Sequence, residues 1–285
     1  MSKFIGLLVI FITVFGGYLL EGGSVMALCQ PAEALIILGA GVGSLVISTP
    51  IPVLKDLLAQ MKNLATSKDD EDILFKDLFC LMDELMTQIQ YQGLKILDQH
   101  LENPENSTIF SKYPEVQKHK VLFQFLIDNL RLQTIGKISP HDLEDMLDME
   151  IERIETDSLR ASSALGRTAE AMPGFGILAA VMGIIITMSH IDGAVSMIGV
   201  RVAAALVGTF IGIFFCYAIL EPIAKAIEAQ VEKEISHLKC LSTMLGTFAK
   251  GKPPIQALDA GRKQIQRENK ISFMELEEMI KEQDA

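Results

Sequence analysis

The stretch RVAAALVGTFIGIFFCYAILEP, residues 201–222, decides the fold class. Between its ends it is almost entirely apolar, with Thr209 as a hydroxyl deep inside it and no carboxylate before Glu221. A helix of about 20 apolar residues is long enough to cross the hydrocarbon core of a bilayer. We therefore predict a transmembrane helix here. Two features of it need an explanation: the hydroxyl of Thr209 inside the apolar stretch, and Pro222 at its end.

The composition agrees with an integral membrane protein. Of the 285 residues, 49% are hydrophobic, and the mean hydropathy is +0.33. The formal charge of -11 argues against a nucleic-acid partner, because phosphates require a basic surface. The four cysteines show no CxxC spacing, and no catalytic or nucleotide-binding motif occurs. We expect no enzyme activity, no metal and no cofactor.

Four stretches have the length of membrane helices: residues 4–20, 26–48, 172–188 and 197–220. Lys and Arg near span ends stay on the cytoplasmic side. They number 13 between 49 and 170 and 10 between 221 and 285, whereas neither short connection within a pair of spans contains one. Both termini and the middle segment are therefore predicted to be cytoplasmic.

These assignments divide the chain into four parts. We predict a first transmembrane hairpin (1–48), a cytoplasmic helical domain (49–170), a second transmembrane hairpin (171–222) and a cytoplasmic C-terminal helical region (223–285). No alternating β pattern occurs, so the predicted fold is all-α, with the third and fourth membrane helices extended into the cytoplasm.

Helical periodicity and capping signals place the cytoplasmic helices. Apolar residues recur at three and four from Glu71, with an interruption at Gly93. Capping boxes, in which a Ser and an acid three residues later cap a helix start, open a long acidic helix at Ser139 and a short one at Ser272. We expect the acidic helix to run on toward the third span as a stalk. The other predicted boundaries are a stop at Asn103-Pro104 and a helix from Pro114 to Gly136.

Small residues mark faces on which membrane helices can pack closely. Ala204, Gly208 and Gly212 are spaced by four in the fourth span, and Ala179 and Gly183 form a similar row in the third. In the second span, the glycines of GAGVG at 39 and 43 suggest another close approach. These positions predict helix packing.

Thr209 adjoins the small-residue face, and Thr187 is a polar position in the third span. The ordinary interpretation is that such a hydroxyl bonds the carbonyl four residues back. The alternative is that it lines a path for an ion. Pro173 and Pro222 lie near the cytoplasmic ends of their spans, where they either form a hinge layer or mark the place where the helices leave the lipid.

An ion pathway through lipid normally includes a titratable side chain. The third and fourth spans contain none at mid-depth, because Arg201 lies near the outer end and Glu221 at the inner edge, while Glu33 lies near the outer end of the second span. If this chain moves protons, another chain must supply the carboxylate.

Several blocks of the sequence resemble the MotA-type flagellar stator proteins, in the family's order. The central block is ALVGTFIGIF (205–214), followed after seven residues by Pro222. The other blocks are TVFGGYLLEGG (13–23), QPAEALIILGAG (30–41), LENPENSTIFSKYP (101–114) and MPGFGILAAVMG (172–183). Together they cover nearly the whole chain.

The resemblance implies a ring of identical copies in the bacterial inner membrane, around a MotB-type partner whose single membrane helix carries the proton-bearing aspartate. It implies that the cytoplasmic body pushes on a flagellar rotor protein. Thr209, Ala180 and Thr187 would border the ion path, and Pro173 and Pro222 would couple it to the cytoplasmic body.

The family places a basic and an acidic residue where a cytoplasmic helix meets the rotor. The matching positions here are Gln90 and Asp98, so the acid is kept and the base is absent. Lys95, one turn before Asp98, could replace the missing base, although a solvated helix face would also explain both charges. The acidic run between Asp142 and Asp157 is interpreted as a solvated stalk face.

Sodium-driven relatives resemble this chain except for a hydroxyl residue where Ala180 stands. Sodium needs several oxygen ligands, so we predict a proton as the driving ion. An ExbB- or TolQ-type energiser is an alternative, but those proteins look different in having three spans and an external amino terminus. A structural scaffold without ion flux is a third hypothesis, and it requires that Thr209 and Pro173 tolerate replacement.

Overall fold

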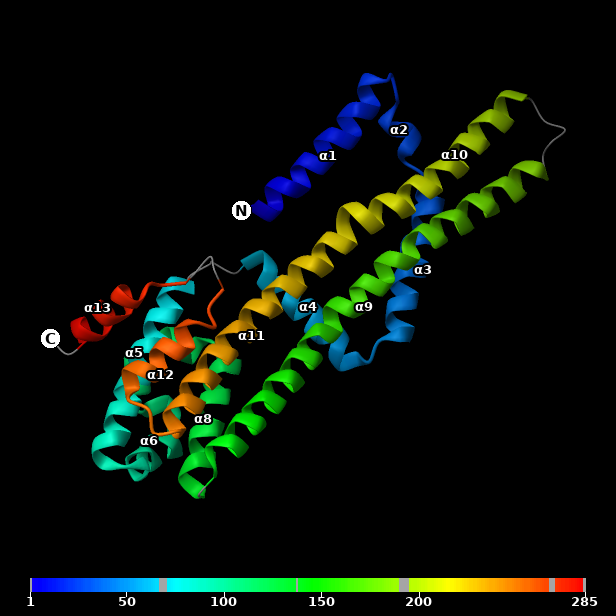
Figure 1. The fold of residues 1–285 in the computed structure, drawn as a ribbon. Helices are drawn as coiled ribbons and strands as arrows, with labels where there is room; N and C mark the ends of the chain where they lie inside the picture. Colours follow the sequence, from blue (N-terminus) through cyan, green and yellow to red (C-terminus); the bar gives the residue numbers. More distant parts are fainter. Residues whose placement is uncertain (1, 67–70, 137, 190–194, 267–269, 284–285) are drawn as a thin grey trace. The chain divides into compact units, whose positions relative to one another are not determined.

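A computed structural model describes residues 2–66, 71–136, 138–189, 195–266 and 270–283. Within these ranges the chain forms helices and their connections, with no strand, which confirms the all-α prediction. The chain divides into two compact units (Figure 1). Unit 1 comprises residues 1–66 and 158–229, and unit 2 comprises residues 67–157 and 230–285.

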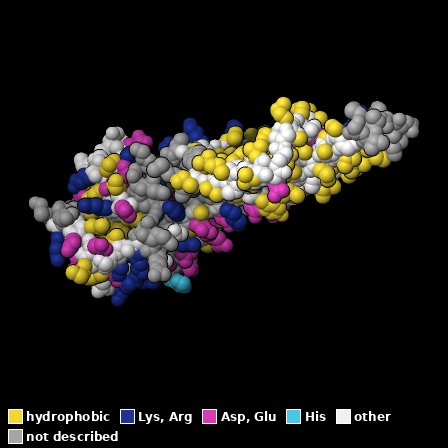
Figure 2. Space-filling model, turned by 90° about the horizontal axis from the view of Figure 1, so that it is seen from above, with side chains coloured by type: hydrophobic (Ala, Val, Ile, Leu, Met, Phe, Trp, Pro, Cys, Tyr) yellow, Lys and Arg dark blue, Asp and Glu magenta, His cyan; other side chains and the backbone are white. Residues whose placement is uncertain are grey.

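Unit 1 contains the apolar helices. Three helices are long and apolar enough to cross a membrane, α3, α9 and the continuous helix formed by α10 and α11, and α1 contributes a shorter apolar segment, Ile5–Leu20. Figure 2 shows hydrophobic side chains gathered over the surface of this unit, with few charged side chains among them. The count of four spans remains a prediction. The helices of the unit are α1 (Ser2–Leu20), α2 (Val25–Leu28), α3 (Pro31–Ser48), α4 (Ile51–Thr66), the end of α9 (Pro140–Met188), α10 (Val195–Phe214), a π-helical segment (Phe215–Leu220) and the start of α11 (Glu221–Ala249).

The two longest helices continue from the membrane spans, as predicted. α9 is a single helix of 49 residues that passes through Gly166 and Pro173 without ending (Figure 1). Its start is capped by Ser139, whose hydroxyl accepts a hydrogen bond from the backbone N–H of Asp142 and donates one to the Asp142 carboxylate. α10 passes into α11 through the π-helical segment, so the fourth span also extends beyond the membrane.

Buried apolar side chains hold unit 1 together in two clusters. Near the start of α4, Val53 and Leu57 pack with Ala161 of α9 and Ile227 of α11. The second cluster joins α3, α9 and the π-helical segment through Ile37, Ala169, Met172, Ala179 and Cys216. α4 was not predicted, and it covers the part of α9 that precedes the predicted third span.

The predicted second span (26–48) is interrupted in the structure. α2 ends at Leu28, and α3 begins at Pro31. Proline suits the first position of a helix, because it lacks the N–H that would be unpaired there, and it disfavours helical geometry at Gln30 before it. The membrane helix therefore starts at residue 31.

Unit 2 is built around α5, whose apolar face is fully buried at Leu78, Phe79 and Leu85. Gly93 interrupts the helix with φ +79°, as its position predicted. The apolar pattern beyond it forms a short 3₁₀ turn and a short helix rather than a continuation of α5. The elements of unit 2 are α5 (Glu71–Gln92), η1 (Leu94–Leu97), α6 (Asp98–Glu102), η2 (Pro104–Asn106), η3 (Phe110–Lys112), α7 (Pro114–Lys118), α8 (Lys120–Ile135), the start of α9, the end of α11, α12 (Pro254–Arg262) and α13 (Phe273–Gln283).

The helix predicted from Pro114 to Gly136 is broken in two. His119 leaves helical geometry, with ψ 79°, between α7 and α8. α12 was not predicted. The capping box at Ser272 is confirmed, since its backbone N–H donates to the Glu275 carboxylate and its hydroxyl accepts from the Glu275 N–H.

Candidate functional site

The closest contact between α9 and α10 is made by glycines. A Cβ atom on Gly212 would lie 2.6 Å from the carbonyl oxygen of Met172 and 3.0 Å from the Cα of Gly176. A Cβ on Gly176 would lie 2.9 Å from the carbonyl oxygen of Gly208. Backbone is in contact with backbone here, which only glycine permits. The predicted packing role of Gly208 and Gly212 fits this geometry.

The small-residue contact continues toward the end of α9 at Met188 and the start of α10 at Val195. A Cβ on Gly183 would lie 3.2 Å from the Cβ of Ala205, which is 1% exposed. Ala205, rather than the predicted Ala204, therefore packs against α9. The contact stripe on α10 is 205, 208, 212, because spacings of three and four keep residues on one side of a helix of 3.6 residues per turn.

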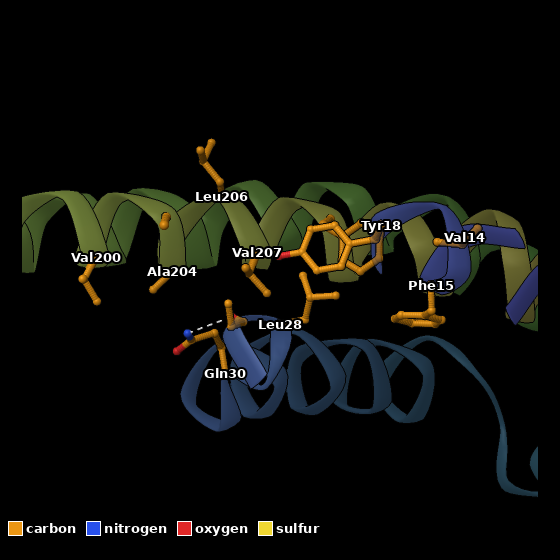
Figure 3. A pocket seen from close by; sticks show the side chains of 12 residues that line it. Val14, Phe15, Tyr18, Leu28, Gln30, Val200, Ala204, Leu206 and Val207 are labelled. Atoms are coloured by element: carbon orange, nitrogen blue, oxygen red, sulfur yellow. Dashed lines mark hydrogen bonds between the residues drawn. The ribbon is translucent and has the colours of Figure 1, made fainter. Parts of the chain in front are cut away.

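Ala204 lies on another side of α10, which faces the first hairpin. It borders an apolar cavity of about 510 Å³ that α1, α2 and α10 enclose, shown in Figure 3. Val200, Ala204 and Val207 point from α10 toward the helices of the first hairpin, whereas Leu206 points away from them (Figure 3). The first hairpin is held there by ring contacts, such as Phe15 with Phe210 at 6.3 Å.

The two threonines of the proposed ion path differ. The Thr187 hydroxyl donates to the carbonyl oxygen of Gly183 at 2.8 Å, the ordinary bond within a membrane helix. The Thr13 hydroxyl in α1 makes the same bond to Val9. The Thr209 hydroxyl makes no hydrogen bond to any residue that the structure describes. The ordinary interpretation therefore holds for Thr187 and not for Thr209, whose hydroxyl is available to another group.

Ala180 lies at the same level, since its backbone nitrogen would be 3.5 Å from a Cβ on Gly208. Glu33 reaches this level too: its Cγ would lie 3.5 Å from the same Cβ position. Glu33 is the third residue of α3, but Gly208 is 13 residues beyond the start of α10, about 20 Å along that helix. The start of α3 thus meets the middle of α10 rather than its first turn.

The two prolines are accommodated differently. Pro173 lies inside α9, which continues as an α-helix on both sides. Pro222 is the second residue of α11, two positions after the π-helical segment ends at Leu220. A π-helical turn shifts the hydrogen-bond pattern by one residue, so the helix can continue past a residue without an N–H. Neither proline ends its helix, and their predicted hinge role remains a prediction.

The comparisons with known proteins place these helices in a family. The profile described as "Motility protein A N-terminal" matches residues 4–93, and that of the "MotA/TolQ/ExbB proton channel family" matches residues 117–240. The chain is 46% identical to the chemotaxis protein LafT of Vibrio parahaemolyticus over the full length of both chains. It is 34% identical to motility protein A of Escherichia coli over 97% of this chain and 94% of that one. The chain belongs to the MotA family.

Solved structures of MotAB complexes share the fold of this MotA-family chain. The Campylobacter jejuni structure matches with a TM-score of 0.76 at 18% identity, over 95% of this chain and 98% of that chain. The stator complex of Bacillus subtilis matches with a TM-score of 0.71 at 22% identity, over 90% and 92% of the two chains. Membership of the MotA family, together with the apolar helices, makes the chain a membrane protein.

The MotA match weakens the ExbB or TolQ alternative, because it includes the N-terminal region that carries the first hairpin. The residues predicted to face a rotor lie in unit 2 of this chain, between the end of α5 and the start of α6. Gln90, Lys95 and Asp98 are all exposed there. We call these three residues the α5–α6 corner.

Three residues of this site were not assigned a role from the sequence: Gly176, Ala205 and Glu33. Gly176 lies within a quoted family block, and its spacing from Ala179 and Gly183 continues the small-residue row, so that row could have revealed it. The same holds for Ala205, three residues before Gly208. No local signal could have brought Glu33 to Gly208, since the two residues are on different hairpins.

Proposed function

We propose that this chain is a stator subunit of the flagellar motor, which forms a proton-conducting complex with a MotB-type partner and converts ion-motive force into torque. The observation that carries the proposal is the Thr209 hydroxyl, which has no hydrogen-bond partner among the described residues and lies beside the glycine contact of α9 and α10, in a chain with full-length MotA relatives. Its α9 and α10 would form the wall of the ion path. The names of the solved MotAB complexes support a MotB-type partner.

The assembly and its orientation belong to the same proposal. Identical copies form a ring around the partner in the bacterial inner membrane, with both termini and unit 2 in the cytoplasm. The distribution of Lys and Arg supports this orientation. The four-part division at 48, 170 and 222 describes which segments are in the membrane. Pro173 and Pro222 would transmit changes at the ion path to the continuous helices α9 and α11.

The driving ion is proposed to be the proton. Ala180 and Glu33 both lie beside Gly208, and Thr209 is the next residue of α10. Ala180 offers only a methyl group, at the position where the sodium-driven relatives are expected to carry a hydroxyl. A sodium ion in a protein site needs several oxygen ligands, whereas a proton needs one acceptor at a time.

Complementation tests partner, family and ion together. In a paralysed strain that lacks its own stator, we expect co-expression with a MotB-type partner to restore swimming, and a proton uncoupler to stop it. Swimming that survives the uncoupler but ends on removal of sodium at constant proton-motive force would contradict proton drive. Failure to restore swimming, with both proteins present in the membrane, would leave a structural scaffold as the better hypothesis.

Charge reversal at the α5–α6 corner tests the rotor contact. Because Lys95 is exposed, Lys95→Glu should leave folding within about 0.5 kcal/mol of the parent. If its charge meets an acidic rotor surface, swarm expansion should fall by about half or more. Proton flux of the complex should be unchanged.

Lys252 supplies the matched control, because it is also an exposed lysine of unit 2 but lies in the turn between α11 and α12. Lys252→Glu should swarm normally. Equal effects of the two reversals would indicate that net charge matters rather than this corner, and would return Lys95 to a solvated helix face.

A further inference from the structure

Glu33 is half-buried, and one of its carboxylate oxygens is buried without a partner. Its Oε2 oxygen is buried and accepts no hydrogen bond from any residue in the described parts of the chain. The other buried side-chain atoms without partners belong to glutamines, so Glu33 is the acid among them. Ionisable groups in membrane helices generally serve a function.

The position of Glu33 links it to the proposed ion path. Its side chain lies over Gly208, in the space that a larger residue would occupy. The next residue of α10 is Thr209, and Ala179 and Ala180 of α9 also lie beside the Cβ position of Gly208. Three helices, α3, α9 and α10, therefore meet where Glu33 lies, and Glu33 is the side chain there that can bind a cation as a carboxylate.

Few other charged groups are within the same layer of unit 1. Arg201 is seven residues, about two turns, before Gly208, and its guanidinium donates to the carbonyl oxygen of Ile186 at 3.4 Å. On α9, no ionisable residue occurs between Glu170 and Met188. On α3, Glu33 is the single charged residue. In the described parts of these helices, no charged side chain is therefore paired with Glu33.

We infer that Glu33 is a second proton-binding site of the conducting complex, on the outer side of the partner's acid. The Glu33 carboxylate takes a proton from water of the outer compartment and becomes a carboxylic acid. It then gives that proton to the carboxylate of the partner, directly or through water, and returns to its charged form. The Thr209 hydroxyl, which can donate and accept, borders this transfer. The inference rests on the proposed function and adds a step within it.

The test uses the complex of this chain with a MotB-type partner, purified and reconstituted in vesicles that contain a pH-sensitive dye. Glu33→Gln keeps the size of the side chain and removes the proton acceptor. We expect it to lower proton flux by about tenfold or more, with the partner still copurifying. Glu33→Asp keeps the carboxyl group and should retain part of the flux.

Glu21→Gln is the matched control, since Glu21 is an exposed acid in the outer connection of the same hairpin. It should conduct as the parent complex does. Parental flux in Glu33→Gln would overturn the inference and leave the proposed function intact. Loss of the partner from Glu33→Gln would overturn it in favour of an assembly contact. If the parent complex conducts no protons, the proposed function fails, and this inference fails with it.

Discussion

Replacement of Gly176 by alanine should abolish motility, although it adds a single methyl group. That methyl would lie 2.9 Å from the Gly208 carbonyl oxygen, 3.2 Å from the Gly212 Cα and 3.3 Å from the Thr209 Cα. All three are backbone atoms, so no side chain can rotate away, and α9 and α10 must separate. Overpacking of this kind costs about 1–3 kcal/mol. Because Thr209 is at the contact, the displacement also changes the proposed ion path.

Gly174 is the matched control for this prediction. It is two residues away on α9, and no atom lies within 4 Å of its Cβ position. Alanine favours helix over glycine by about 1 kcal/mol, so Gly174→Ala should preserve or raise stability and keep motility. The measurements are swarm diameter and the thermal midpoint of the purified complex. Two variants with equal motility would show that α9 and α10 do not depend on the close contact.

The start and the length of α9 could be predicted from the sequence, because the local signals there are strong. The capping box at Ser139 fixed the start of α9, and the absence of breakers before Gly166 predicted its long run into the third span. Pro173 did not end the helix, because a membrane helix tolerates the loss of one backbone hydrogen bond. The small-residue rows likewise predicted that α9 and α10 approach closely.

The choice among neighbouring small residues could not be made from the sequence. Gly39 and Gly43 were the expected contacts of α3, yet neither has an atom within 4 Å of its Cβ position. Gly41 is the packed residue, with the Met172 sulfur 2.7 Å from its Cβ position. Spacing identifies a possible face, but the rotation of one helix against another depends on all the side chains between them.

A helix break at a residue other than glycine or proline also could not be predicted from the local sequence. His119 separates α7 from α8 although nothing in its neighbourhood opposes helix. Its ring lies 6.1 Å from that of His237, on a helix far along the chain. A tertiary contact of this kind can override helical propensity.

Acid should destabilise unit 2 through His237, which is 5% exposed and packs edge-on against the Phe75 ring at 5.0 Å. Desolvation lowers the pKa of His237 from its ordinary 6.5 to about 4, and His119 and Lys233 add to this by their positive charge. Between pH 6.5 and 4 the unfolded chain binds a proton here that the folded chain does not. The free energy of unfolding is therefore highest above pH 6.5, as far as this group is concerned. It falls by about 3 kcal/mol as the pH drops from 6.5 to 4.

His237→Phe should remove this part of the acid sensitivity, because phenylalanine can keep the ring contact with Phe75 and cannot bind a proton. We expect the thermal midpoint of the full chain in detergent to fall less between pH 7 and pH 4.5 in the variant than in the parent. Other groups, such as Asp77, whose pKa is raised by burial, titrate in both proteins and cancel in the difference. His141→Phe is the control, since its side chain is 84% exposed on α9. If the parent and His237→Phe lose stability equally, His237 is protonated in the folded protein, and its burial does not exclude the proton.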